Sequence, residues 1–289
     1  MFEMSKFSLK GKTAIVTGGG RGIGQAIAIG FAKAGARVVV TSRKIADLEA
    51  TAEQIKSFGG EAFPVQAHLG KMDEIKKMVD TAMEKLGGKI NILVNNAGAS
   101  PNMASVLDSD ERLWDTIMNL NLKGLYFTSQ VVANIMKKQG GGKIINVASI
   151  DGFKPEQGVS VYSISKNGVR SITWAFASEL AQFNIQVNTI APGPFDTKMM
   201  NSHWFALSPE EAKRQRGELE KMLPMGRMGD PVEIAGAAIY FASDASSYTT
   251  GSEMVIDGSI LLAAMHPVQK RQLIFQHKRP RHIDMPGPC

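Results

Sequence analysis

The chain has 289 residues, 44% of them hydrophobic and 21% charged, which is typical of a globular protein. We expect one large domain, 1–264, followed by a basic C-terminal extension, 265–289. The net charge of +6 gives little support to nucleic-acid binding, because the extension holds five Lys and Arg against one Asp and so carries most of the excess. Long apolar runs are missing, so we expect no membrane span and no signal peptide. The one cysteine is Cys289, so we expect no disulfide and no metal site, and the expected location is the cytoplasm.

Predicted strands and helices alternate strictly along the chain. The apolar runs predict strands at 13–17, 37–41, 62–66, 90–94, 143–148, 185–190 and 253–256. Helical patterns lie between them at 22–35, 46–58, 72–86, 111–138, 159–183 and 231–242. Such alternation implies right-handed crossovers and a parallel sheet with helices on both faces. The predicted fold is therefore doubly wound α/β, with a ligand site at the carboxyl ends of the strands.

A glycine-rich loop follows the first strand and opens the first helix. Glycines allow close approach of the backbone to a pyrophosphate, and the helix directs its amino end at the negative charge. A glycine-rich turn can also simply end a strand, but the position of this one favours nucleotide binding. The predicted contacts are Gly18, Gly20, Arg21, Gly22, Ile23 and Gly24.

The end of the second strand bears on the choice between NADP and NAD. An acid there would bind a ribose 2′-hydroxyl, whereas an arginine accommodates a 2′-phosphate. The chain reads Thr41-Ser42-Arg43 and has no acid until Asp47. Ser42, Arg43 and Arg21 therefore predict NADP, with NAD possible; alternatively, Arg43 is a solvated residue that stacks on adenine.

Three side chains between 149 and 166 together indicate acid–base chemistry. Tyr162 and Lys166 are four residues apart on a predicted helix, so they lie on one face, and Ser149 ends the preceding strand. A nearby ammonium is expected to lower the pKa of the phenol, which would make Tyr162 a proton donor and acceptor for an alcohol or carbonyl. Ser149 would hydrogen-bond the same oxygen. The tyrosine–lysine spacing alone can arise by chance on an amphipathic helix.

Taken together, six motifs resemble the short-chain dehydrogenase/reductase family. They are the glycines at 18, 22 and 24, Asn95-Asn96-Ala97-Gly98, Asn121, Ser149, the YSISK run from Tyr162 to Lys166, and Pro192-Gly193. The resemblance covers roughly Leu9 to Ala264. It implies a Rossmann fold with seven parallel strands, an NAD(P) cofactor, hydride transfer between a carbonyl and an alcohol, and a homotetramer built partly on the long helices that hold Asn121 and Tyr162.

The resemblance also implies roles for single residues. Tyr162 would be the acid/base, Ser149 would orient the substrate oxygen, Lys166 would bind the nicotinamide ribose, and Asn121 would support a water-linked proton relay. Further cofactor contacts would come from His68, Leu69, Asn95, Ala97, Gly98, Pro192, Gly193 and Thr197. His68 is a departure, because the family usually has an aspartate there, and this puts the adenine contact in doubt.

The segment after Pro192 is rich in large apolar residues and could be a lid over an apolar ligand or ordinary loop packing. The predicted substrate contacts are Ser149, Phe153, Gln157, Tyr162, Phe195 and Met199, with Asn102 and Met103 as further walls and Met200, His203, Trp204, Phe205 and Leu207 in the same segment.

Two classes of function remain open from the sequence. One is an NADP-linked reductase or dehydrogenase of a medium-sized, largely apolar ketone or secondary alcohol, with a 3-oxoacyl-thioester reductase as the alternative. The other is a nucleotide-binding regulator without activity. In the extension, Leu273, Ile274 and Phe275 favour anchoring on a neighbouring subunit or over its pocket, with a disordered extension as the alternative.

Overall fold

The computed structural model describes residues 3–100, 104–201, 204 and 207–265. The predictions for Asn102, Met103, His203, Phe205 and the extension beyond 265 lie outside the described residues. Within the described ranges, no helix is long and apolar enough to cross a membrane.

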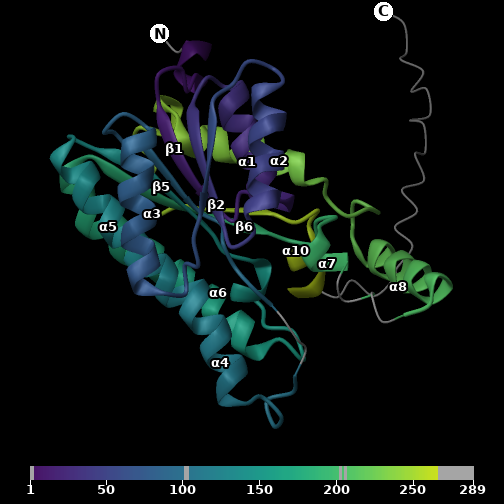
Figure 1. Ribbon diagram of the computed structural model, residues 1–289. Helices are drawn as coiled ribbons and strands as arrows, with labels where there is room; N and C mark the ends of the chain where they lie inside the picture. Colours follow the sequence, from purple (N-terminus) through teal and green to yellow (C-terminus); the bar gives the residue numbers. More distant parts are fainter. Residues whose placement is uncertain (1–2, 101–103, 202–203, 205–206, 266–289) are drawn as a thin grey trace, which may run out of the picture.

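Seven parallel strands form the sheet, in the order β3-β2-β1-β4-β5-β6-β7 (Figure 1). Each strand pairs in parallel register with its neighbour; Thr17, for example, lies opposite Thr41. The bounds are β1 Thr13–Thr17, β2 Arg37–Ser42, β3 Ala62–Gln66, β4 Ile92–Asn95, β5 Gly142–Val147, β6 Ile185–Pro192 and β7 Glu253–Ile256. The predicted doubly wound fold is confirmed.

Successive side chains along each strand point to opposite faces of the sheet and pack into two separate hydrophobic cores, one on each face. In β1, Ala14 and Val16 pack into one cluster with Phe31, while Ile15 points to the other face and packs with Ile75. Every residue of β1 is buried, which is expected for a parallel strand covered on both faces. The first core lies under α1 (Gly22–Lys33), α2 (Ile45–Lys56) and α9 (Ala235–Ala242), and the second under α3 (Met72–Lys85), α5 (Leu125–Lys138) and α6 (Ser160–Leu180).

The predicted helix at 111–138 is one helical stretch with an irregular middle. It begins as α4 (Glu111–Met118), widens into a π-helical segment at Asn119–Gly124, and continues as α5. Such widened turns often occur at functional sites because they redirect a side chain. The segment contains Asn121, which is fully buried.

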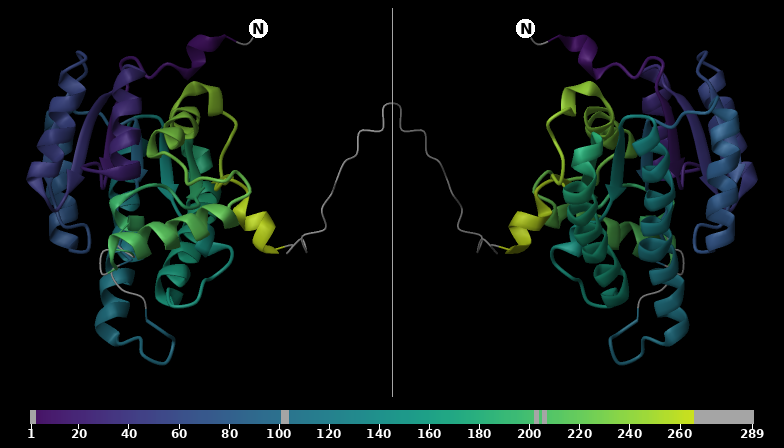
Figure 2. Two further views of the ribbon diagram at one scale, coloured as in Figure 1. Left: turned by 90° about the vertical axis from the view of Figure 1, so that its right-hand side faces the viewer. Right: turned by 90° about the vertical axis from the view of Figure 1, so that its left-hand side faces the viewer.

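Three helices outside the two main layers gather at the carboxyl end of the sheet. They are α7 (Lys198–Asn201), α8 (Pro209–Met222) and α10 (Ile260–Met265), drawn close together in Figure 1. The side views in Figure 2 also place α10 (yellow) beside α8 (green), and Leu219 and Ile260 belong to one apolar cluster. The Ser208 hydroxyl caps α8 by accepting from the Glu211 amide.

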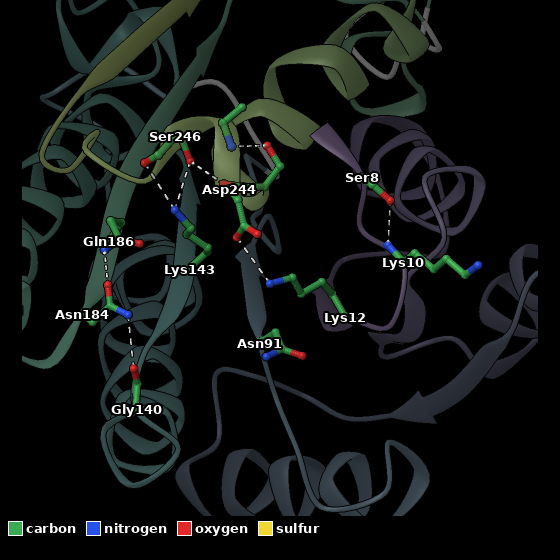
Figure 3. Close-up of polar contacts among 12 residues, drawn as sticks. Ser8, Lys10, Lys12, Asn91, Gly140, Lys143, Asn184, Gln186, Asp244 and Ser246 are labelled. Carbon is green, nitrogen blue, oxygen red and sulfur yellow. Dashed lines mark hydrogen bonds and ion pairs between the residues drawn. The ribbon is translucent and has the colours of Figure 1, made fainter. Parts of the chain in front are cut away.

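The opposite end of the sheet is closed by polar contacts to the segment before β7 (Figure 3). The Lys143 ammonium donates to the carbonyl and hydroxyl of Ser246, at 3.3 and 3.2 Å, and Lys12 pairs with Asp244 at 3.4 Å. Burial lowers the pKa of Lys143 to about 8. These contacts fix the starts of β1 and β5 to the segment before β7, and they lie away from the ligand end of the sheet.

Candidate functional site

A cavity of about 520 Å³ opens at the carboxyl ends of the strands. Loops after β1, β2, β4, β5 and β6 contribute to it, which is where a ligand lies in this class of sheet. Most of the predicted contacts line it: Gly18, Gly20, Arg21, Gly22, Ile23, Gly24, Ser42, Arg43, Leu69, Ala97, Gly98, Ser149, Gln157, Tyr162, Lys166, Pro192, Gly193, Phe195, Thr197 and Met199.

The glycine loop adopts a conformation that requires glycine at two positions. Gly18 and Gly22 have φ of 67° and 55°, in the region that other residues rarely adopt. No side chain caps the amino end of α1, since the preceding Arg21 makes no capping hydrogen bond. The first amide groups of α1 therefore face the cavity without a side-chain acceptor, as a phosphate site requires.

Thr17 and Asn96 hold this loop against β4, although the sequence did not single them out as site residues. The Thr17 hydroxyl donates to the Val94 carbonyl and accepts from the Asn96 and Ala97 amides, at 3.1, 2.9 and 3.0 Å. The Asn96 side-chain amide donates to the carbonyls of Thr17 and Gly18. The second asparagine of the Asn-Asn-Ala-Gly run therefore fixes the loop from the neighbouring strand.

Three cations stand near the end of β2 and the glycine loop. Arg21, Arg43 and Lys44 all line the cavity, and none forms an ion pair with a described residue. Asp47, at the start of α2, is the one acid that lines this end. An unpaired arginine cluster is suited to an anion.

The predicted trio of Ser149, Tyr162 and Lys166 meets at the other end of the cavity. Ser149 follows β5 and is 8% exposed, and Tyr162 is in the first turn of α6. The Lys166 ammonium lies 5.6 Å from the centre of the Tyr162 ring and donates to the Val147 carbonyl at 2.8 Å. The strand end and the helix thus converge as the spacing predicted.

The pKa of the Tyr162 phenol is raised, opposite to the predicted direction. Burial is the main cause and the charge of Asp151 adds to it, while the hydrogen bond with Ser149 acts in the other direction. Burial also lowers the pKa of Lys166 to about 8, against the opposing influence of Asp151. The phenol is therefore held in its protonated form at neutral pH, which is the form of a proton donor.

Asn121 lies behind the trio and does not line the cavity. Its amide group accepts from the Ala99 amide at 2.8 Å and donates to the Ala99 carbonyl and to the Ser165 hydroxyl. Ser165 in turn donates to the Tyr162 carbonyl at 2.6 Å. The π-helical segment is therefore connected to the first turns of α6.

Three other predicted contacts lie outside the cavity lining. His68 accepts from the Gly70 amide and faces a separate hollow of about 650 Å³ that also borders Arg43. Asn95 donates to Ser129 and Asn146 inside the fold. Phe153 stacks on the Arg170 guanidinium, 3.6 Å from the ring centre. The structure thus places Asn95 and Phe153 in packing positions.

Asp151 and Glu156 line the cavity and were missed by the sequence analysis, which looked for apolar walls. The Asp151 amide donates to the Ser149 hydroxyl at 3.2 Å, and its side chain is half-buried. Burial, with the charge of Glu156 as the second cause, raises the pKa of Asp151 to about 6. The apolar wall instead comes from α7, α8 and α10, through Met199, Met200, Leu219, Met222 and Ile260.

This raised pKa predicts that Asp151→Asn stabilises the protein above pH 6. The folded state resists ionisation of Asp151, so the ionised carboxylate destabilises the fold. This destabilisation is small at pH 4 and grows until the pH passes about 6. A rise in the Asp151 pKa from its ordinary value to about 6 corresponds to a gain on the order of 3 kcal/mol in the free energy of unfolding at pH 8. Urea unfolding of the wild type and of Asp151→Asn at pH 4.5 and pH 8 measures this gain. An equal difference in the free energy of unfolding at the two pH values would contradict the prediction.

The chain is similar to known proteins over most of its length. A model of the short chain dehydrogenase family matches residues 12–206. The chain is 39% identical to 2-dehydro-3-deoxy-D-gluconate 5-dehydrogenase of Escherichia coli, over 89% of this chain and 98% of that one. A crystal structure of a 3-oxoacyl (acyl-carrier-protein) reductase of Agrobacterium tumefaciens with NADP bound is 30% identical, with TM-score 0.81 and coverage of 89% and 97%. A 7α-hydroxysteroid dehydrogenase complexed with NADH is 34% identical, with TM-score 0.82 and the same coverage.

Proposed function

Because the chain belongs to the short-chain dehydrogenase family and is an NAD(P)-dependent oxidoreductase of carbonyls and alcohols, we propose that it is an NADP-linked reductase of ketones with an apolar body. The observation that carries this proposal is the convergence of Ser149, Tyr162 and Lys166 on one cavity with the glycine loop. The cofactor, when bound, supplies the hydride.

The residues of the cavity fit a dinucleotide. The two left-handed glycines and the uncapped amino end of α1 suit a pyrophosphate. Gly20 and Gly193 also line the cavity, and both pack so closely on Asp47 and Asp257 that a Cβ would collide with them. Arg21, Arg43 and Lys44, at the far end from Tyr162, suit a 2′-phosphate. The NADP-bound relative supports this choice, and the NADH-bound relative keeps NAD as the alternative.

The proposed proton transfer uses the protonated phenol. Tyr162 donates its proton to the substrate oxygen as negative charge develops there, and the Ser149 hydroxyl hydrogen-bonds the same oxygen. Lys166, with its pKa lowered to about 8, remains largely protonated at pH 7 and favours the phenolate left behind. Asn121 holds the first turns of α6 through Ser165.

The direct test is turnover with NADPH and NADH against cyclic ketones, aliphatic ketones, sugars and 3-oxoacyl thioesters, followed by absorbance of the reduced cofactor. We expect turnover of at least one ketone class with NADPH. Cofactor binding without turnover across the panel would favour the non-catalytic regulator.

The cofactor preference gives a prediction of its own. Arg43→Asp removes a phosphate partner and adds a charge that repels the phosphate and accepts from a ribose hydroxyl. We expect the ratio of kcat/KM for NADPH over NADH to fall at least about a hundredfold, since a lost ion pair and a new repulsion each contribute on the order of 1–3 kcal/mol.

Lys77→Asp, an exposed charge reversal on α3, is the matched control and should leave that ratio unchanged. A wild-type protein that already prefers NADH would refute the assignment to Arg43.

Exposed aromatic side chains support assembly into a homotetramer. The side chains of Trp114 on α4, Tyr126 on α5 and Trp174 on α6 are 43%, 38% and 47% exposed. Ile164, also on α6, is 49% exposed. Large apolar side chains gathered on neighbouring helices mark a contact surface. The mass of the protein in solution tests this.

A further inference from the structure

Charge is unevenly distributed in the cavity. The basic side chains belong to the cofactor side: Arg21, Arg43 and Lys44 lie near the glycine loop. Lys198, the first residue of α7, also lines the cavity, between Thr197 of the cofactor contacts and Met199 of the apolar wall. On the substrate side, between β5 and α6, the charged side chains of the lining other than Lys166 are two acids, Asp151 and Glu156.

Asp151 lies close to the reacting groups. It is two residues after Ser149, and its amide donates to the Ser149 hydroxyl. Asp151 lines the same cavity as Tyr162 and Lys166, and its charge influences the pKa of both groups.

No cation of the described residues neutralises this carboxylate by an ion pair. The ion pairs found there involve neither Asp151 nor Glu156. The Lys166 ammonium, which lines the same cavity, is 4% exposed and donates to the Val147 carbonyl. The Ser149 side chain hydrogen-bonds the carboxylate, but this bond does not outweigh the effect of burial on the pKa of Asp151. A half-buried carboxylate without an ion pair is costly to the fold unless a bound group neutralises its charge.

We propose that Asp151, assisted by Glu156, selects substrates that carry a cationic nitrogen within a few bonds of the reacting carbonyl, and discriminates against those that carry a carboxylate there. This rests on the proposed reductase function and narrows its substrate class. The apolar wall of Met199, Met200, Leu219, Met222 and Ile260 then holds the body of the same molecule.

The charges of Asp151 and Glu156 favour a cationic substrate over an anionic one. A substrate cation beside Asp151 gains an ion pair shielded from water, whereas a carboxylate in that place meets two like charges. Asp151 also opposes formation of the Tyr162 phenolate, and a cation that neutralises Asp151 removes that opposition. Glu156 is exposed, so solvent screens it and its share is the smaller one.

The experiment compares three aliphatic ketones of one chain length, ending in a methyl, a trimethylammonium or a carboxylate group, with three to six carbons between that end and the carbonyl. Trimethylammonium is used because a primary amine would cyclise onto the ketone. At the best chain length we expect kcat/KM with NADPH to be at least tenfold higher for the cationic ketone than for the neutral one, and lowest for the carboxylate.

Asp151→Asn should lower the ratio of kcat/KM for the cationic ketone over the carboxylate ketone at least tenfold, and Glu156→Gln should lower it less. Asp80→Asn, an exposed acid on α3, is the matched control and should leave the ratio unchanged. The wild-type protein offers an independent measurement: hexyltrimethylammonium should inhibit reduction of the neutral ketone at lower concentration than hexanoate.

Equal ratios in wild type and Asp151→Asn, or stronger inhibition by hexanoate, would overturn the inference while leaving the reductase intact. Failure to reduce any ketone in the broader panel would instead overturn the proposed function.

Discussion

Tyr162→Phe is expected to lower kcat about a thousandfold or more while the affinity for NADPH stays within a few-fold of wild type. The substitution keeps the ring and removes the only proton that the phenol can give to the substrate oxygen, and general acid catalysis contributes on the order of 10²–10⁴ in rate. The raised pKa of the phenol keeps this proton on Tyr162 at neutral pH in the wild-type protein. Single-turnover reduction of the preferred ketone measures the effect, with binding followed by NADPH fluorescence.

Tyr248→Phe is the matched control, because Tyr248 is fully exposed and does not line the cavity. We expect it to behave as wild type. Near-normal turnover in Tyr162→Phe would show that another group supplies the proton, and the role given to the trio would then be wrong.

Gly24→Ala is expected to weaken NADPH binding at least tenfold and to reduce the free energy of unfolding by about 1–3 kcal/mol. A Cβ at Gly24 would collide with the Asn96 side-chain amide and with the Gly18 carbonyl. Those two groups hydrogen-bond each other, so the collision displaces both the glycine loop and its support on β4. Calorimetric titration with NADPH and urea unfolding measure the two effects.

Gly217→Ala is the control of opposite sign. Gly217 lies inside α8, and a Cβ there would meet no heavy atom within 4 Å. Alanine should therefore stabilise the protein by ~0.5–1 kcal/mol through the lower entropy of its unfolded chain. A Gly24→Ala protein that binds NADPH as well as wild type would show that the loop has more freedom than this packing indicates.

The strands and the arrangement of the trio were predictable because both depend on local periodicity. The bounds of β1, β3 and β7 agree with the prediction to the residue. Alternation also explains why the Asn96 side chain, and not that of Asn95, supports the loop: neighbouring side chains on a strand point to opposite faces.

The remaining differences depend on distant contacts. The π-helical segment at Asn119–Gly124 leaves the apolar pattern of the helical stretch almost unchanged, so periodicity did not reveal it. The direction of the Tyr162 pKa depends on burial and on Asp151, whereas the prediction considered only the neighbouring lysine on the helix. Phe153 was expected in the pocket because it is near Ser149 in sequence, but Arg170 holds its ring elsewhere.

The strand order has a consequence for dividing this chain into fragments. β1 pairs with β2 and with β4, so the loop that follows β1 is completed only by residues near 96, some 80 positions later. A fragment that stops before β4 would contain every glycine of the loop, yet the Thr17 hydroxyl would lack its three backbone partners and β1 would be an open edge. The smallest excisable phosphate-binding unit therefore extends through Gly98, and a circular permutant that opens the chain between β2 and β4 keeps both sides of the loop in one molecule.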